Sequence, residues 1–241
     1  MNILIICGFY LTASTLIGVI IGLFAKSNNL SANDSILAFS GGIMLYTSFS
    51  SLIIPPVYSN DIFSFYAGIL GLLTGTVFIS LIDGVPNFVK KILQDECDNE
   101  KIASVLLFVT AVAVHKIPEG IASGLTSAST SAQAMSLSIG LAVQNIPDGF
   151  IVSSPLVLAG VNKKKSFLVG ASTALFSLFG MFLGYLGASF LFKFIDFFLA
   201  FAGGMMLFVT ASLIKQICLN KLTATVLCFG IILMMLFERY I

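Results

Sequence analysis

Long apolar runs constrain the fold of this chain more than any other feature of the sequence. A helix that crosses a membrane needs about 20 apolar residues in succession. Eight such runs lie at residues 3–25, 35–57, 62–85, 102–126, 132–160, 167–192, 195–217 and 221–237. Only helices and closed barrels satisfy every backbone polar group inside a bilayer, and runs of this length favour helices. We therefore predict an all-α integral membrane protein with one transmembrane domain covering residues 1–241.

Charged residues are too few to cover a water-soluble surface. They make up 10% of the 241 residues, whereas 58% are hydrophobic, and soluble domains carry about 25% charged residues. A soluble enzyme is therefore excluded, and the lipid bilayer is the expected partner. With a net charge of +1, nucleic-acid binding has no support. The sequence also contains no nucleotide-binding motif and indicates no organic cofactor.

The basic residues outside the spans predict the orientation of the chain. With the N-terminus outside, only Lys193 and Arg239 fall on the outer side. The inner connections then hold Lys26, Lys90, Lys91, Lys101, Lys163, Lys164, Lys165, Lys215 and Lys221. Lys and Arg accumulate on the cytoplasmic side of membrane proteins. Because the number of spans is even, both termini are expected outside.

An internal repeat connects the second and seventh spans. The segment AFSGGIMLYTSFSSL (38–52) returns as AFAGGMMLFVTASLI (200–214), and the predicted orientation makes the two copies run in opposite directions. Inverted repeats are typical of secondary transporters, whose sites lie near the middle of the membrane. The alternative is that both copies are generic close-packing sequences. The spaced glycine pairs at 18/22, 71/75 and 180/184 indicate helix packing.

Two matched motifs concentrate the polar chemistry of the spans. AVAVHKIPEGIASGL (111–125) and GLAVQNIPDGFIVSS (140–154) share the pattern A-V-x-x-I-P-acid-Gly. In each motif a nitrogen- or oxygen-bearing side chain precedes a carboxylate by four residues, so the two share a helix face. These pairs are His115 with Glu119 and Gln144 with Asp148.

Charged residues inside a membrane require a partner or a function. Each costs about 2.5–3.5 kcal/mol at the centre of a span, and the two motifs contain Lys116, Glu119 and Asp148. One imidazole, two carboxylates and amide oxygens suit a divalent cation, whose charge the carboxylates neutralise. We predict a metal site, for which the alternative is an interhelical polar network with Lys116 paired to an acid. The predicted ligands are His115, Glu119, Gln144 and Asp148, with Asn145 and Lys116 as second-site or modulating residues.

The motifs HKIPEG and QNIPDG resemble the paired metal-binding motifs of the ZIP family of metal transporters, especially its bacterial zinc permeases. The Gly-Met-Leu segments of the repeat and LIDGVP (81–86) are also similar, and the resemblance covers essentially the whole chain. It implies eight transmembrane helices in a 3+2+3 arrangement with an inverted repeat. It also implies a binuclear site in the fourth and fifth helices. His115, Glu119, Gln144 and Asp148 match the first metal position. Asn145 matches the second, with Glu119 and Asp148 bridging the two.

The sequence departs from the family pattern at several positions. Lys116 stands where the family usually has a metal-ligating Asn, and an ammonium group only donates hydrogen bonds and repels a cation. We therefore predict one transported ion, with Lys116 taking the place of the second. Asp148 replaces the usual Glu and shortens the side chain by one methylene. The acidic residues on the inner side form an accessory metal site or a solvated loop: Asp83, Asp95, Glu96 and Asp98.

The sequence thus predicts a secondary transporter and not an enzyme. It moves divalent metal into the cytoplasm through a site between the fourth and fifth helices, with zinc as the first candidate and iron, manganese or cadmium as others. The resemblance implies a bacterial inner (plasma) membrane. One alternative is an intramembrane metalloenzyme, against which stands the lack of an HExxH motif. Another is a cation- or proton-coupled transporter of a different small solute. The oligomeric state is left open, with a homodimer as one option.

Overall fold

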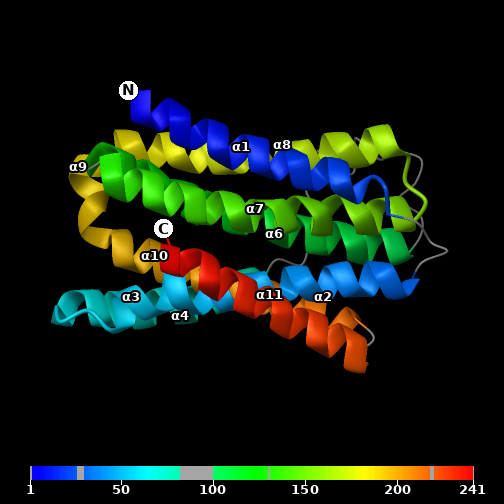
Figure 1. The fold of residues 1–241 in the computed structure, drawn as a ribbon. Coiled ribbons are helices and arrows are strands. Elements are labelled where there is room, and N and C mark those ends of the chain that lie inside the picture. The colour runs from blue at the N-terminus through cyan, green and yellow to red at the C-terminus, as the bar shows by residue number, and fades with distance from the viewer. Residues whose placement is uncertain (1, 26–29, 82–99, 130, 218–219, 241) are drawn as a thin grey trace.

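The computed structural model of the chain describes residues 2–25, 30–81, 100–129, 131–217 and 220–240. Every regular element in these ranges is a helix (Figure 1). The long helices are α1 (Asn2–Gly22), α2 (Leu30–Thr47), α4 (Ile62–Ser80), α6 (Glu100–Ser129), α7 (Ser131–Leu158), α8 (Lys163–Leu186), α10 (Ile195–Gln216) and α11 (Lys221–Tyr240). The short helices are the π-helix η2 (Ser48–Ile53), α3 (Ile54–Val57), α9 (Ala188–Leu191) and the 3₁₀ helix η3 (Phe192–Phe194).

Seven stretches of the described residues are long and apolar enough to cross a membrane. These are Ile3–Gly22, Asp34–Val57, Ile62–Ser80, Ala134–Leu158, Lys163–Leu186, Ala188–Lys215 and Lys221–Tyr240. They confirm the predicted class, an all-α integral membrane protein. The remaining long helix, α6, carries Lys116 and Glu119 in its middle and is not among the seven. The count of eight spans therefore stays a prediction.

The boundary between the predicted sixth and seventh spans differs in the structure. The apolar run 167–192 predicted one span up to Phe192, but α8 ends at Leu186. Gly187 follows as its C-cap and donates its backbone N–H to the Leu183 carbonyl at 2.9 Å. The chain then continues through α9 and η3 into α10. An apolar run does not show where a glycine ends a helix within it.

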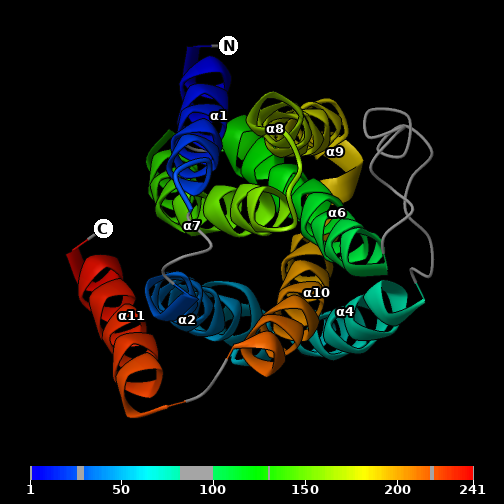
Figure 2. The same ribbon diagram turned by 90° about the vertical axis from the view of Figure 1, so that its right-hand side faces the viewer.

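The long helices form two groups that lie side by side. One group contains α1, α6, α7 and α8, and the other contains α2, α4, α10 and α11 (Figures 1 and 2). Within the groups, the most extensive helix pairs are α6–α8, α1–α7, α4–α10 and α2–α11. Between the groups, α6 packs against α10 and α7 packs against α2. The two motif helices, α6 and α7, therefore lie in one group and face the other.

Glycines bring the backbones of these four helix pairs into direct contact. In the first group, a Cβ added to Gly18 would lie 1.9 Å from the backbone oxygen of Ile146, and one added to Gly180 would lie 2.2 Å from that of Ile117. In the second group, a Cβ added to Gly75 would lie 2.1 Å from the backbone oxygen of Phe201, and one added to Gly42 would lie 2.1 Å from that of Leu227. No side chain fits into such spaces. This geometry confirms that the spaced glycine pairs serve helix packing. Gly42 belongs to the first copy of the internal repeat, so that motif also has a packing role.

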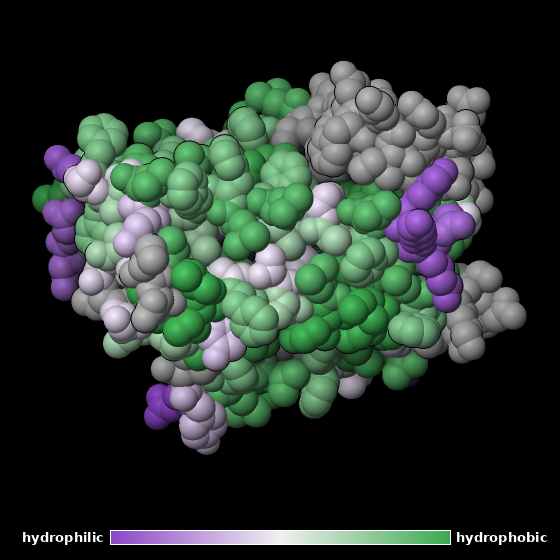
Figure 3. Space-filling model, turned by 90° about the horizontal axis from the view of Figure 1, so that it is seen from above, coloured by the Kyte–Doolittle hydropathy of each residue, from purple (hydrophilic) through white to green (hydrophobic). Residues whose placement is uncertain are grey.

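The outer surface of the bundle is apolar between its two ends. Side chains such as Phe9, Leu73 and Phe179 are more than half exposed. In Figure 3 hydrophobic residues cover the middle of the molecule, and the hydrophilic residues gather towards the two ends of the helices. Lipid is the solvent that matches this surface, because apolar side chains lose nothing by facing hydrocarbon.

We expect Gly180→Ala to destabilise the bundle, since the new methyl group would collide with the Ile117 carbonyl oxygen of α6. Overpacking of this kind costs about 1–3 kcal/mol. Unfolding in mixed detergent micelles, followed by circular dichroism, measures the change. Gly140→Ala on α7 is the matched control, because a Cβ at that position meets nothing within 4 Å. Equal stabilities of the two variants would contradict the role of Gly180 in close packing.

Candidate metal site

Six polar side chains of the two motifs meet between α6 and α7, and all six are buried. Their exposed fractions are 3% or less. Helix α6 contributes His115, Lys116 and Glu119, and helix α7 contributes Gln144, Asn145 and Asp148. Both helices continue through the proline of their motif, Pro118 or Pro147. The i, i+4 spacing therefore holds across the proline and keeps each pair on one face.

His115, Glu119 and Asp148 converge on a common point. The His115 Nε2 atom lies 3.7 Å from Glu119 Oε1 and 3.6 Å from Asp148 Oδ2. One ligand atom from each of the three residues lies within 4.8 Å of the other two. Two buried atoms of the group, His115 Nε2 and Asp148 Oδ1, have no hydrogen-bond partner among the described residues. Because such an atom costs about 1–3 kcal/mol, this geometry favours a ligand that both atoms can contact.

Lys116 also contacts Asp148. Its ammonium Nζ donates to Asp148 Oδ2 at 3.0 Å and also to Asn145 Oδ1. The structure thus contains the ion pair that the sequence left as an alternative, between Lys116 and one of the acids. The same Asp148 Oδ2 atom lies 3.6 Å from His115 Nε2, and the second oxygen, Oδ1, has no hydrogen-bond partner among the described residues. A polar network and a cluster of three metal-ligand residues therefore share Asp148.

Gln144 links the cluster to the second helix group. Its Nε2 donates to Glu119 Oε1 at 3.0 Å and lies 3.1 Å from the Met206 sulfur of α10. In this orientation the amide nitrogen faces the carboxylate, so binding a metal through Oε1 requires the amide to turn over. Met206 was not predicted as a neighbour of the site. The available signal was its place in the GGMML segment of the repeat.

Three further contacts hold the motif helices in place. Asn145 Nδ2 donates to the Leu11 carbonyl of α1 at 3.4 Å. Beside the carboxylates, the glycine of each motif packs against a neighbouring helix backbone. An added Cβ would lie 2.2 Å from the Ser177 oxygen of α8 at Gly120 and 2.3 Å from the Thr15 oxygen of α1 at Gly149. Helices α8 and α1 thus pack against the two motif helices and hold them in position.

The predicted accessory residues on the inner side lie outside the described residues. These are Asp83, Asp95, Glu96 and Asp98, together with most of the LIDGVP segment. The choice between an accessory metal site and a solvated acidic loop therefore stays open.

Comparison with known proteins places this fold and cluster in a family. Residues 92–238 match the family model described as ZIP zinc transporter, so the chain belongs to the ZIP zinc transporter family. It is 29% identical over 215 residues to the zinc transporter ZupT of Chlorobaculum parvum, covering 82% of this chain and 80% of the relative. It is also 27% identical over 188 residues to ZupT of Chlorobium chlorochromatii, covering 71% of this chain and 70% of the relative.

Family membership confirms the resemblance seen in the motifs. It makes the chain a multi-pass membrane transporter of divalent metal ions, rather than an enzyme. The metalloenzyme alternative is thereby set aside. The metal ion is the cargo of the protein, and the buried group of His115, Glu119 and Asp148 has the chemistry to hold it.

We expect Asp148→Asn to destabilise the protein strongly, because it leaves the Lys116 ammonium buried beside a neutral amide. Breaking one partner of a buried ion pair costs about 3–5 kcal/mol. The double variant Lys116→Met/Asp148→Leu removes both charges and is expected to lose less than Asp148→Asn alone. Unfolding in micelles without added metal measures both. If Asp148→Asn were as stable as wild type, the Lys116–Asp148 pair would have no structural role.

Proposed function

We propose that this chain moves zinc into the cytoplasm through a site in the middle of the membrane between α6 and α7. The ligands are His115, Glu119, Gln144 and Asp148. The observation that carries the proposal is the convergence of a histidine and two carboxylates, with two buried ligand atoms that have no partner among the described residues. The relatives named above are zinc transporters, which makes zinc the first ion to test.

The distances in the cluster support a zinc ion. Zinc bound tetrahedrally, at about 2.0–2.2 Å from each ligand atom, sets those atoms about 3.4 Å apart. His115 Nε2 already lies 3.6 and 3.7 Å from the two carboxylate oxygens. Because Asp148 Oδ2 also accepts from Lys116 Nζ at 3.0 Å, an ion at this point shares that oxygen with Lys116 or binds the unpartnered Oδ1 after a rotation of the carboxylate. A shell made mostly of oxygen, with one imidazole and no thiolate, also suits an ion that must leave again.

Lys116 limits the proposed site to one ion. Its ammonium group contacts Asn145 and Asp148, two residues that match the second metal position of the family pattern. A positive charge between them repels a second cation and neutralises one of the two carboxylates. The site then holds one dication at a time, in place of the binuclear pair implied by the family resemblance.

The packing of the helices supports eight membrane spans, in which α6 is added to the seven apolar stretches named above. The α1–α7 pair corresponds to α8–α6, and α2–α11 corresponds to α10–α4. In these correspondences α1 is the counterpart of α8, α2 of α10 and α4 of α11. Helices α6 and α7 are counterparts of each other. This is the relation expected for a 3+2+3 inverted repeat. Asn2 and Tyr240 lie towards the same end of the bundle (Figure 1), and the distribution of Lys and Arg makes that end the outer one.

Alternating access follows from the division into two helix groups. The site lies on α6 and α7, on the side of the first group that faces α2 and α10. Movement of one group along the other would expose the site first to one side of the membrane and then to the other. The contact between Gln144 and Met206 must break and form again during that movement.

Glu119→Gln tests the site itself. The change keeps the size of the side chain and removes its negative charge, and we expect zinc uptake into proteoliposomes to fall at least about tenfold. Asp61→Asn is the matched control, because Asp61 is an exposed carboxylate at the start of α4, far from the cluster in sequence and structure. Iron, manganese and cadmium are measured in parallel. Full uptake by Glu119→Gln would contradict the proposed mechanism.

The number of bound ions tests the role of Lys116. We expect the purified wild type to hold one zinc per chain, measured by elemental analysis after dialysis. Lys116→Asn restores the residue usual in the family and is expected to bind a second ion. Two ions per chain in the wild type, or one in both proteins, would show that Lys116 does not control the stoichiometry.

A further inference from the structure

A cavity of about 500 Å³ lies between the two helix groups on the side of the proposed site where α6 ends and α7 begins. Its walls come from the end of α6, the first half of α7, η2, the start of α10 and the end of α11. All of these are segments at one end of the bundle. By the distribution of Lys and Arg, that end faces outwards.

The cavity leads to the proposed metal site. Along α7 its wall runs from Ser136 to Gln144, a distance of about 12 Å on a helix. Gln144 is the last of these residues along α7 and donates a hydrogen bond to Glu119. An ion that reaches Gln144 through the cavity is therefore beside the carboxylate that would bind it.

The charge of the cavity wall has one sign. Asp196 at the start of α10 and Glu238 at the end of α11 line it, and none of the lining residues in the described part of the chain is Lys, Arg or His. Two basic residues lie close by in sequence, but neither lines the cavity: Lys193 lies over the ring of Phe63, and Arg239 is exposed. A concave surface with one sign of charge and apolar walls concentrates counter-ions. This cavity therefore attracts cations.

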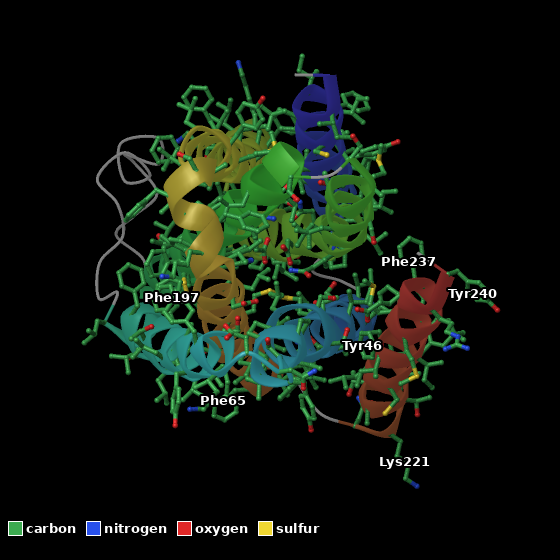
Figure 4. The ribbon with its side chains drawn as sticks, turned by 90° about the vertical axis from the view of Figure 1, so that its left-hand side faces the viewer. Tyr46, Phe65, Phe197, Lys221, Phe237 and Tyr240 are labelled. Carbon is green, nitrogen blue, oxygen red and sulfur yellow. The ribbon has the colours of Figure 1, made fainter. Side chains whose placement is uncertain are left out.

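Glu238 is held in place by a specific local structure. Ser50 and Ser51 of η2 both donate hydrogen bonds to its carboxylate, the second at 3.1 Å. Their neighbours Thr47 and Ser48 instead donate to carbonyls one turn back in α2. Figure 4 views this end of the bundle and labels Tyr46 and Phe237 on the two neighbouring helices, α2 and α11.

The π-helix explains why these two serines face α11. Pro55 and Pro56 follow η2 and have no backbone N–H, so they cannot donate to carbonyls four residues earlier. The backbone N–H of Ile54 instead donates to the Phe49 carbonyl, five residues back. Such wider turns occur frequently at functional sites. Here the wider turn positions two hydroxyl groups on a carboxylate that lines the cavity.

We infer that this cavity is the outer vestibule of the transporter, in which the Glu238 carboxylate, assisted by Asp196, captures a hydrated divalent cation for transfer to the Gln144–Glu119 site. The inference rests on the proposed function, since it supplies the outer path to that site. Glu238 acts before the ion is bound and does not contact His115 or Asp148. Its removal therefore weakens capture without slowing the movement of an ion that is already bound.

Zinc uptake by intact cells, in which only the outer face is accessible, tests the inference with Glu238→Gln and Asp196→Asn. Glutamine has no charge but can still bond both serines, accepting from one through Oε1 and donating its Nε2–H to the hydroxyl oxygen of the other. We expect KM to rise about 3–10-fold for Glu238→Gln, with an unchanged maximal rate, as steering by one carboxylate is lost. At high ionic strength the difference should shrink, because salt screens the attraction. Glu238→Asp should stay close to wild type.

Asp61→Asn is again the control, since Asp61 lies at the same end but does not line the cavity. An unchanged KM for Glu238→Gln at low ionic strength, or a lower maximal rate at the same KM, would overturn the inference. Glu119→Gln, measured in parallel, separates the two proposals. If Glu119→Gln stops uptake while Glu238→Gln behaves as wild type, only the inference about the vestibule is refuted. If wild-type cells take up no zinc, the proposed function itself fails.

Discussion

The buried contact between Lys116 and Asp148 joins α6 to α7 at the centre of the bundle. Charges in such an apolar interior are stable only when each has a partner. The ammonium group of Lys116 contacts both Asn145 and Asp148, and this contact sets the register of the two helices. That register brings His115 and Glu119 beside Asp148. Glycine contacts with α1 and α8 then hold the pair in position.

The same ion pair links the structure to transport. It uses one oxygen of Asp148 and leaves the other without a partner among the described residues, which is the basis of our proposal that the site holds one ion. Gln144 connects the cluster to the second helix group through Met206 and also lines the cavity between the two groups. Two of the acids with described side chains form the cluster, and two more line that cavity. Four of the six acids with described side chains therefore lie in the cluster or along this cavity, and Asp34 and Asp61 do not.

Much of this arrangement could be predicted from the sequence, because membrane helices and buried charges leave strong signals. Apolar runs predicted the long helices to within a few residues at most ends, and the four-residue spacing placed His115 with Glu119 and Gln144 with Asp148. Contacts between distant helices left no such signal. Met206 beside Gln144 and the π-helix that turns Ser50 towards Glu238 depend on packing across the two groups. The end of α8 at Gly187 was missed for a different, local reason, because hydropathy alone does not show where a glycine ends a helix inside an apolar run.

The most direct test of the central claim, that the α6–α7 cluster binds the transported ion, is an anomalous-scattering map at the zinc absorption edge from crystals of the zinc-loaded protein. The structure leads us to expect one peak per chain, about 2.0–2.2 Å from His115 Nε2 and from oxygens of Glu119 and Asp148. The Lys116 ammonium would remain in contact with Asp148 and Asn145. Zinc bound only at the surface of the molecule, with no peak between α6 and α7, would contradict the claim.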